Sequence, residues 1–147
     1  MRIDDICSSK VEYISLNASA RAAAGMMHES RVGTLVVLAR NGATPIGILT
    51  DRDLVLKVLA KGVSAEAVSV ADVMTKDVGT CKGSQELFDA VQIMHRYGVR
   101  RLPVVNEDGA AIGLVSADDI YSALATHMRE LSQAMLREQI HELEAFP

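Results

Sequence analysis

Residues 45–53 of the chain read PIGILTDRD, and residues 111–119 read AIGLVSADD. Aligned with a shift of 66 positions, the two stretches place glycine on glycine and the final aspartate on aspartate. The match continues upstream at a shift of 67, because the second copy is one residue shorter after Gly109, and there AAAGMMHESRV (22–32) lies over AVQIMHRYGV (90–99) with His28 on His95 and Val32 on Val99. The chain therefore contains two copies of one unit. Because a unit of roughly 60 residues buries too little surface for a robust fold alone, we expect the two copies to share an interface.

Each copy predicts the same order of elements: a short N-terminal extended segment, a helix, two strands joined by a turn, and a second helix. The strands are predicted from runs of β-branched and aliphatic residues. These runs are Thr34–Leu38 and Ile46–Leu49 in the first copy, and Leu102–Val105 and Ile112–Val115 in the second. The mixture of helices and strands predicts an α/β fold built in layers.

Cap and turn residues mark the ends of these elements. Asn17 and Ser84 precede the first helix of each copy, and their side chains suit the N-cap position. Asn41-Gly42 and Asp108-Gly109 lie between the paired strands. Such dipeptides accept a positive φ at both residues, so they predict tight hairpins with type I′ turns.

The second helix of the second copy continues from Asp118 with no Pro or Gly before Pro147. Apolar residues recur along it at helical spacing, which predicts an amphipathic helix. They are Ile120, Leu124, Met128, Leu131 and Met135, followed by a shifted stripe of Leu136, Ile140 and Leu143. We expect a helical extension over residues 126–147 that contacts a second subunit. Packing onto its own chain is the alternative.

Composition excludes several classes of protein. The net charge of −4 at pH 7 argues against nucleic-acid binding, which favours an excess of Lys and Arg. No run approaches the ~18 apolar residues of a membrane helix, and the N-terminal MRIDDICSSK does not resemble an export signal. Cys7 and Cys81 have no CxxC spacing, so we expect buried, reduced thiols and a cytoplasmic location rather than a disulfide or a zinc site.

The two copies resemble a known family. GILTDRD and GLVSADD, with GVRRLPVV from Gly98 and ADVMTKDV from Ala71, are similar to the motifs of paired CBS domains, also called the Bateman module. The resemblance covers about residues 3–125 and points to a stand-alone CBS pair. It implies one repeat over 3–62, a linker over 63–69 and a second repeat over 70–125, related by pseudo-two-fold symmetry. It also implies a homodimer in which two modules form a flat disc.

The repeated motif has the pattern Gly, apolar, apolar, Thr or Ser, any two residues, Asp. A glycine in a strand lets another backbone or a ligand approach closely, and a strand-to-helix junction is a natural anion site. The resemblance implies that the Asp binds ribose hydroxyls and that the Thr or Ser contacts phosphate or ribose. The candidate ligand-binding residues are Gly47, Thr50 and Asp53, and Gly113, Ser116 and Asp119. The same spacing also fits a helix capping box, which needs no ligand.

Arg100 and Arg101 precede the Leu-Pro of the second copy. The resemblance implies that basic residues here face the ligand phosphate, a task suited to the bidentate guanidinium. The alternative is two exposed arginines at the start of a strand. The first copy has Gly33 and Thr34 at the matching positions, so the two clefts are not equal. The sequence does not assign either arginine to one cleft.

The resemblance implies reversible binding of an adenosine-containing ligand in the clefts between the repeats. AMP, ADP and ATP are the first candidates, followed by NAD(H) and S-adenosylmethionine. The ligand would shift the population of two arrangements, and an unidentified regulated protein would respond in trans. The alternative function is a structural or protein-interaction module with empty clefts that acts through its C-terminal helix.

We expect no catalytic activity. The sequence has no P-loop, no Ser/His/Asp or Cys/His arrangement and no carboxylate pair suited to acid–base chemistry. His28 and His95 match between the copies but lack an HxxxH or Cys partner, so they are interpreted as structural helix residues rather than metal ligands. No obligatory cofactor is expected, and the nucleotide would be a regulatory ligand.

Overall fold

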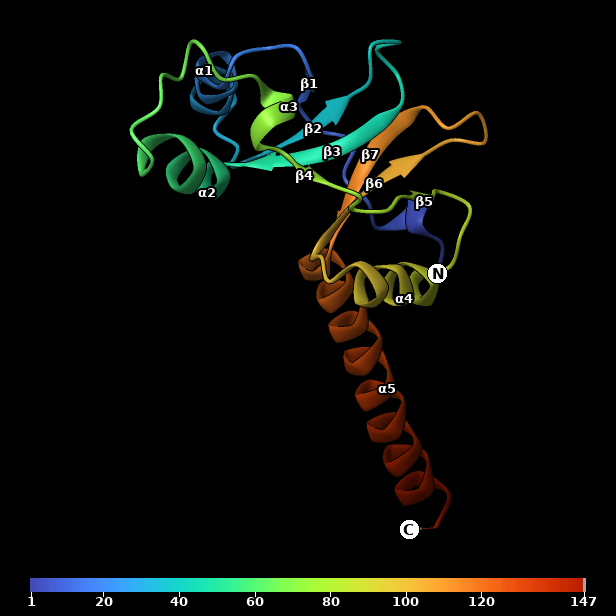
Figure 1. The fold of residues 1–147 in the computed structure, drawn as a ribbon. Helices are drawn as coiled ribbons and strands as arrows, with labels where there is room; N and C mark the ends of the chain where they lie inside the picture. Colours follow the sequence, from blue (N-terminus) through green and yellow to red (C-terminus); the bar gives the residue numbers. More distant parts are fainter. Residues whose placement is uncertain (147) are drawn as a thin grey trace.

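The computed structural model describes residues 1–146 as two small sheets with helices around them and one long helix leading away (Figure 1). The first sheet holds, in this order, β1 (Tyr13–Ser15), β2 (Thr34–Leu38), β3 (Pro45–Thr50) and β4 (Thr75–Lys76). The second holds β5 (Cys81–Lys82), β6 (Arg101–Val105) and β7 (Ala111–Ser116). The predicted layered α/β fold with two matching repeats is confirmed.

Helices follow the strands in matching positions in the two copies. The helices of the first copy are η1 (Ile3–Asp5), α1 (Ala20–Ser30) and α2 (Asp51–Leu54), and α2 continues as a π-helical turn, η2 (Val55–Leu59). Those of the second copy are α3 (Val70–Val73), α4 (Leu87–Tyr97) and α5 (Ala117–Ala145). The first segment of each copy, predicted as extended, therefore starts with a short helical turn instead.

The strands of the two sheets pair in the same way. β1 runs parallel to β2, and β2 runs antiparallel to β3. In the second sheet β5 runs parallel to β6, and β6 runs antiparallel to β7. β4 pairs with β3, and a single bridge between Ser8 and Leu114 takes the equivalent place beside β7. The four strand predictions are confirmed to within one residue at each end.

The N-terminal segment of each copy packs into the core of the other copy. Ile3 is fully buried in a cluster with Leu102 and Val115 of the second copy. Its counterpart Val70 is fully buried among first-copy residues that include Leu35. This exchange of segments ties the two halves together. It is the shared interface that two small units require.

Both predicted helix caps are wrong by two residues. α1 is capped by Ser19, whose Oγ accepts a hydrogen bond from Ala22 N at 3.0 Å, and not by Asn17. α4 begins after Glu86 and not after Ser84. In each copy the chain makes one more turn before the helix begins, and Ser84 instead donates from Oγ to Glu107 at 3.0 Å.

The predicted type I′ hairpins are also wrong. Gly42 and Gly109 have φ of 70° and 82°, but Asn41 and Asp108 do not have positive φ. A type I′ turn needs positive φ at both central residues. The loops are longer because asparagine side chains hold them: Asn106 Oδ1 accepts from the backbone N–H groups of Asp108 and Ala110, both at 3.0 Å.

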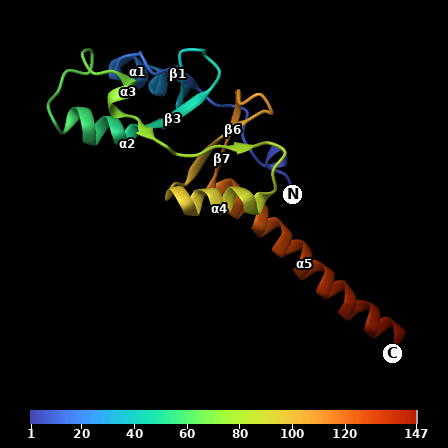
Figure 2. The same ribbon diagram turned by 45° about the vertical axis from the view of Figure 1, so that its right-hand side comes forward.

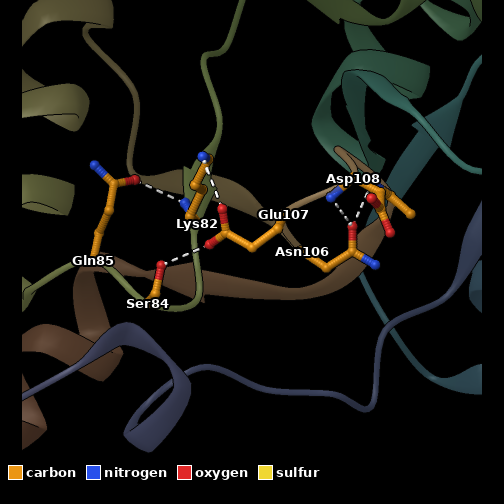
Figure 3. Close-up of polar contacts among 7 residues, drawn as sticks. Lys82, Ser84, Gln85, Asn106, Glu107 and Asp108 are labelled. Carbon is orange, nitrogen blue, oxygen red and sulfur yellow. Dashed lines mark hydrogen bonds and ion pairs between the residues drawn. The ribbon is translucent and has the colours of Figure 1, made fainter.

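Polar contacts fix the second hairpin loop to the segment before α4 (Figure 3). Glu107 accepts hydrogen bonds from Lys82 Nζ and Ser84 Oγ, each at 3.0 Å. These bonds and the nearby lysine charge lower the pKa of the fully exposed Glu107 carboxyl below its ordinary value. The loop therefore has a defined position beside the segment that precedes α4.

α5 begins against the second sheet and then leaves the body of the molecule in both views (Figures 1 and 2). Its buried residues, Ile120 and Ala123, lie in the first two turns. The predicted continuous C-terminal helix is confirmed as far as Ala145, and Pro147 lies outside the described residues. None of the helices within residues 1–146 combines the length and the apolar character needed to cross a membrane.

Candidate ligand-binding clefts

Two open clefts contain residues of both repeats. The first, named the Ser116 cleft, has a volume of about 320 Å³. Its lining residues are Ser8, Lys10, Val11, Glu12, Val32, Gly33, Thr34, Arg101, Leu114, Ser116 and Asp119. The second, named the Thr50 cleft, has a volume of about 270 Å³. Its lining residues are Ile48, Thr50, Thr75, Val78, Gly98, Val99, Arg100 and Arg101.

The two clefts are pseudo-symmetric counterparts. Ser116 in one cleft corresponds to Thr50 in the other, and Leu114 corresponds to Ile48. Each cleft combines the strand-to-helix junction of one copy with the segment before the first central strand of the other copy. Gly33 and Arg100 occupy matching positions there. The two clefts are thus formed by matching backbone segments, but the charged side chains that line them differ.

Thr50 and Asp53 form a complete capping box at the start of α2. Thr50 Oγ1 accepts from Asp53 N at 3.2 Å, and Asp53 Oδ2 accepts from Thr50 N at 3.0 Å. The other carboxylate oxygen, Oδ1, lies 3.1 Å from Lys57 Nζ. Lys57 also donates to the carbonyl oxygen of Val73 at 2.9 Å. Both oxygens of Asp53 therefore have partners within the protein.

Ser116 and Asp119 form the matching box at the start of α5. Ser116 Oγ accepts from Asp119 N at 3.1 Å, and Asp119 Oδ2 accepts from Ser116 N at 2.8 Å. The position that matches Lys57 is Ala123, a buried residue without charge. Within residues 1–146 no hydrogen bond or ion pair reaches Asp119 Oδ1, so this oxygen can accept from a ligand in the cleft.

The two motif glycines contact backbone and not the clefts. A β-carbon on Gly47 would stand 2.8 Å from the carbonyl oxygen of Thr75, and one on Gly113 would stand 2.6 Å from that of Ser8. Real β-carbons are essentially never found this close. The glycines are therefore explained by the docking of the exchanged N-terminal segments. Neither glycine lines either cleft.

The two arginines have different positions. Arg101 lines both clefts, whereas Arg100 lines only the Thr50 cleft. Arg100 also lies 3.6 Å from Asp118, with both side chains more than 70% exposed, so this ion pair contributes little to stability. The Ser116 cleft has a second cation, Lys10, which sequence reasoning missed. Its position in the second copy holds Asp77, so the repeat comparison gave no signal for it.

A larger hollow of about 520 Å³ lies beside Asp77, Arg96 and Tyr97. No candidate ligand-binding residue lines it, and part of its wall is the tyrosine ring packed against Gly79. It is larger than either cleft, and its lining also includes Asp77, Thr80 and Arg96, but it contains neither of the two helix-capping boxes. The clefts remain the candidate site because Thr50, Ser116, Asp119 and the two arginines of the repeated motifs line them.

None of the histidines or cysteines within residues 1–146 lines either cleft. His28 and His95 are exposed in the last turns of α1 and α4. Cys81 is buried and Cys7 is half-buried. Burial raises the pKa of the Cys81 thiol to about 12, and burial followed by the charge of Asp4 raises the pKa of the Cys7 thiol above its ordinary value.

Two small repeats that exchange their first segments, with a cleft on each side of the pair, define a CBS pair. The chain belongs to the CBS domain family, because the CBS domain profile matches residues 3–60 and 70–126. The resemblance found in the sequence is confirmed.

Several relatives have the same repeats. The CBS domain-containing protein YhcV of Bacillus subtilis is 30% identical over 118 residues, which cover 80% of this chain and 81% of YhcV. Protein MK0525 of Methanopyrus kandleri is 39% identical over 94 residues, 64% of this chain, and the match spans about half of its length (47%). Homoserine O-acetyltransferase of Methanobrevibacter ruminantium is 30% identical over 125 residues, 85% of this chain, but only 24% of that enzyme is matched.

Solved structures share the fold. The CBS-domain containing protein ATU1752 of Agrobacterium tumefaciens is 30% identical with a TM-score of 0.69, covering 84% of this chain and 98% of that one. Protein PAE2072 of Pyrobaculum aerophilum, complexed with AMP, is 23% identical with a TM-score of 0.72, covering 86% and 99%. The CBS pair of MJ0100, in complex with 5′-methylthioadenosine and S-adenosylmethionine, is 23% identical with a TM-score of 0.72, and the match covers 86% of this chain and 98% of that one.

Proposed function

We propose that this chain is a regulatory module that binds an adenosine nucleotide, first of all AMP, ADP or ATP, and signals its presence to a protein partner in trans. The observation that carries this proposal is the Ser116 cleft. There Asp119 Oδ1 has no partner within residues 1–146, and Arg101 and Lys10 line the same space. A carboxylate for hydroxyl groups and two cations for phosphate match the two polar ends of a nucleotide.

The ribose of a nucleotide carries neighbouring hydroxyl groups that donate to a carboxylate. Asp119 suits this role because its Oδ2 holds the helix cap while Oδ1 stays available. The phosphate would lie near Arg101, whose planar fork binds phosphate oxygens in pairs. The AMP complex of PAE2072, which has the same fold, supports this choice of ligand class.

The cations favour a phosphate-bearing ligand over S-adenosylmethionine. Arg100 and Arg101 give the lining of the Thr50 cleft an excess of positive charge, and in the Ser116 cleft Arg101 and Lys10 lie beside the carboxylates Glu12 and Asp119, while S-adenosylmethionine carries a positive sulfonium and no phosphate. The MJ0100 complex shows that the fold itself accepts such ligands. In this chain the charges rank AMP, ADP and ATP first and NAD(H) next.

The Ser116 cleft is proposed as the principal site. The lining of the Thr50 cleft does not include Asp53, and Lys57 already holds Asp53 Oδ1, so a ribose that reached this carboxylate would have to displace an ion pair. Binding in either cleft would favour one arrangement of the two repeats by the difference in affinity between the arrangements. A partner in trans would respond to that arrangement. We propose no catalytic role, and the bound nucleotide should be recovered unchanged.

Calorimetric titration with AMP, ATP, NADH and S-adenosylmethionine tests the proposal. Asp119→Ala should abolish the tightest binding, whereas Asp53→Ala should spare it. Asp89→Ala is the matched control: Asp89 Oδ2 caps α4 by accepting from Glu86 N at 2.9 Å, away from both clefts. It removes the same type of capping bond and should leave binding intact.

A folded, ligand-free protein that binds none of the four compounds would contradict the proposal. That result would favour the second candidate, an interaction module with empty clefts. The exposed length of α5 is the observation that supports this alternative. A protein captured through residues 126–146 alone would then identify the function.

A further inference from the structure

The projecting part of α5 carries an apolar surface that nothing in residues 1–146 covers. From Ala125 onward every helix residue is exposed. Six large apolar side chains on it are between 46% and 73% exposed: Met128, Leu131, Met135, Leu136, Ile140 and Leu143. Single exposed apolar residues are ordinary, but a continuous row of them marks an interaction surface.

The sequence of this segment is self-complementary when read in opposite directions from the point between Met135 and Leu136. Counting outward, Met135 matches Leu136, Leu131 matches Ile140, and Met128 matches Leu143. Every large apolar residue thus has an apolar counterpart. The polar pair Ser132 and Gln139 also match.

Charged residues follow the same rule with opposite signs. The first end of the segment carries His127 and Arg129, and the last end carries Glu142 and Glu144. Counting outward, Arg129 matches Glu142 and His127 matches Glu144. Glu130 matches His141, with the acidic residue now at the first end of the segment and the histidine at the last end. Such a pattern is complementary to a second copy of itself only when the two copies run in opposite directions.

We propose that α5 pairs with α5 of a second copy of this chain as two antiparallel helices around a two-fold axis between Met135 and Leu136. In this arrangement Met128, Leu131 and Met135 of one helix contact Leu143, Ile140 and Leu136 of the partner helix. The His127–Arg129 end of one helix lies beside the Glu142–Glu144 end of the other. A parallel pair would instead place glutamates beside glutamates, which is unfavourable.

The length of the helix fits this arrangement. The uncovered part of α5 runs from Ala125 to Ala145, and the centre of the sequence pattern lies within one residue of its midpoint. At ~1.5 Å per residue, the helix extends about 16 Å from Ala125 to that centre. Phe146, which is 82% exposed, would then reach the base of the other copy near the partner's Tyr121, a residue 68% exposed.

The apolar stripe changes side between Met135 and Leu136, so the contact should be centred on this point. A long coiled coil needs an uninterrupted heptad repeat, which the segment lacks. The contact is separate from both clefts, because none of the residues from 125 to 146 lines them. The pairing and nucleotide binding can therefore be tested separately.

Disulfide trapping in the full chain tests the pairing. The antiparallel arrangement places position 128 beside position 143 of the partner, and it places the two copies of position 128 about 22 Å apart at ~1.5 Å per residue. A chain with Met128→Cys and Leu143→Cys should form cross-linked dimers under mild oxidation. Chains with either substitution alone should not, and the wild-type chain reports any linkage through Cys7 or Cys81.

Charge reversal in the double-cysteine chain tests the direction independently. Arg129→Glu, or Glu142→Arg with Glu144→Arg, should slow cross-linking about tenfold, because each reversal acts twice around the axis. Combining all three substitutions should restore the rate. Arg137→Glu, the same charge change on the far side of the helix, should have little effect.

The single variants also give the opposing results. Cross-linking of the chain with only Met128→Cys would overturn the antiparallel pairing in favour of a parallel one. No cross-linking of the double-cysteine chain would overturn pairing altogether and leave the surface to a different protein. Reversals that slow the reaction without rescue on combination would also contradict the proposal.

Discussion

The carbonyl oxygen of Ser8 occupies the space where a side chain at position 113 would stand, 2.6 Å from the position of a Gly113 β-carbon. Around this contact Ser8 N donates to Leu114 O at 2.9 Å, and Leu114 N donates to Ser8 O at 3.0 Å. The exchanged N-terminal segment is thus docked on β7 through the glycine. Gly47 and Thr75 repeat the relationship at 2.8 Å on the other side of the pair.

Gly113→Ala should therefore loosen the docking of the first segment. We expect the free energy of unfolding to fall by about 1–3 kcal/mol, the usual cost of overpacking, as measured by urea denaturation. Gly25→Ala is the control, because no atom lies within 4 Å of its added β-carbon and α1 should gain up to about 1 kcal/mol. Equal stability of Gly113→Ala and wild type would show that the segment shifts without cost.

The sequence was sufficient to predict the repeat and its strands but not the exchange of segments. Thr34–Leu38 and Leu102–Val105 are rich in β-branched residues, a local property that survives in the fold. By contrast, Ile3 and Val70 are apolar whichever core they enter. Because the two copies have matching sequences, their apolar pattern is the same whether the first segment packs on its own copy or on the other copy.

Lys57 should weaken nucleotide binding in the Thr50 cleft. Its Nζ lies 3.1 Å from Asp53 Oδ1 and 2.9 Å from Val73 O. Lys57→Met keeps the apolar stem but frees the carboxylate, so nucleotide binding that depends on Asp53 should tighten several-fold. The free energy of unfolding should fall by about 1 kcal/mol, since the Val73 carbonyl loses its donor.

Calorimetry with Lys57→Met in the Asp119→Ala background isolates the Thr50 cleft. Lys61→Met is the control for charge, because Lys61 is exposed and forms no ion pair within residues 1–146. Unchanged affinity in Lys57→Met would show that the ion pair does not compete with the ligand.

Substitution of Arg101 should weaken AMP binding at more sites than substitution of Arg100, because only Arg101 lines both clefts. Arg101→Ala should weaken AMP binding at least tenfold, the loss of a charge-assisted hydrogen bond, at both sites. Arg100→Ala should affect only the Thr50 cleft. Adenosine, which lacks phosphate, distinguishes the cause: its affinity should stay the same in both variants. Equal losses for adenosine and AMP would indicate a structural role for Arg101.

The sequence predicted the hydroxyl–aspartate pairs of the candidate site because both copies repeat them. It did not predict Lys10 or Lys57, whose matching positions hold Asp77 and Ala123. These lysines act through contacts that differ between the copies, and a repeat comparison detects only what the copies share. Asp53 and Asp119 both form the helix-capping boxes that the sequence offered as the alternative interpretation. The proposed role in ligand binding is additional to this capping role.

The cysteines should be unreactive until the protein unfolds. Burial raises the pKa of Cys81 from 9.0 to about 12 and raises that of Cys7 above its ordinary value, which lowers the fraction of each thiol in the reactive thiolate form. A chromogenic disulfide reagent should modify Cys81 only at the rate of unfolding, and Cys7, which is half-buried, somewhat faster. In denaturant both should react at once.

The raised pKa of Cys81 should make the free energy of unfolding fall at alkaline pH, as should the raised pKa values of Cys7 and Tyr13. The folded state holds the Cys81 proton more tightly than the unfolded state, so its contribution is complete below pH 9 and declines as the pH rises from about 9 toward 12. Cys81→Ala should flatten this decline, measured by denaturation at pH 8 and pH 10, while lowering stability at pH 8 through the small cavity it leaves. Rapid modification of Cys81 in the native protein at pH 8 would contradict its raised pKa.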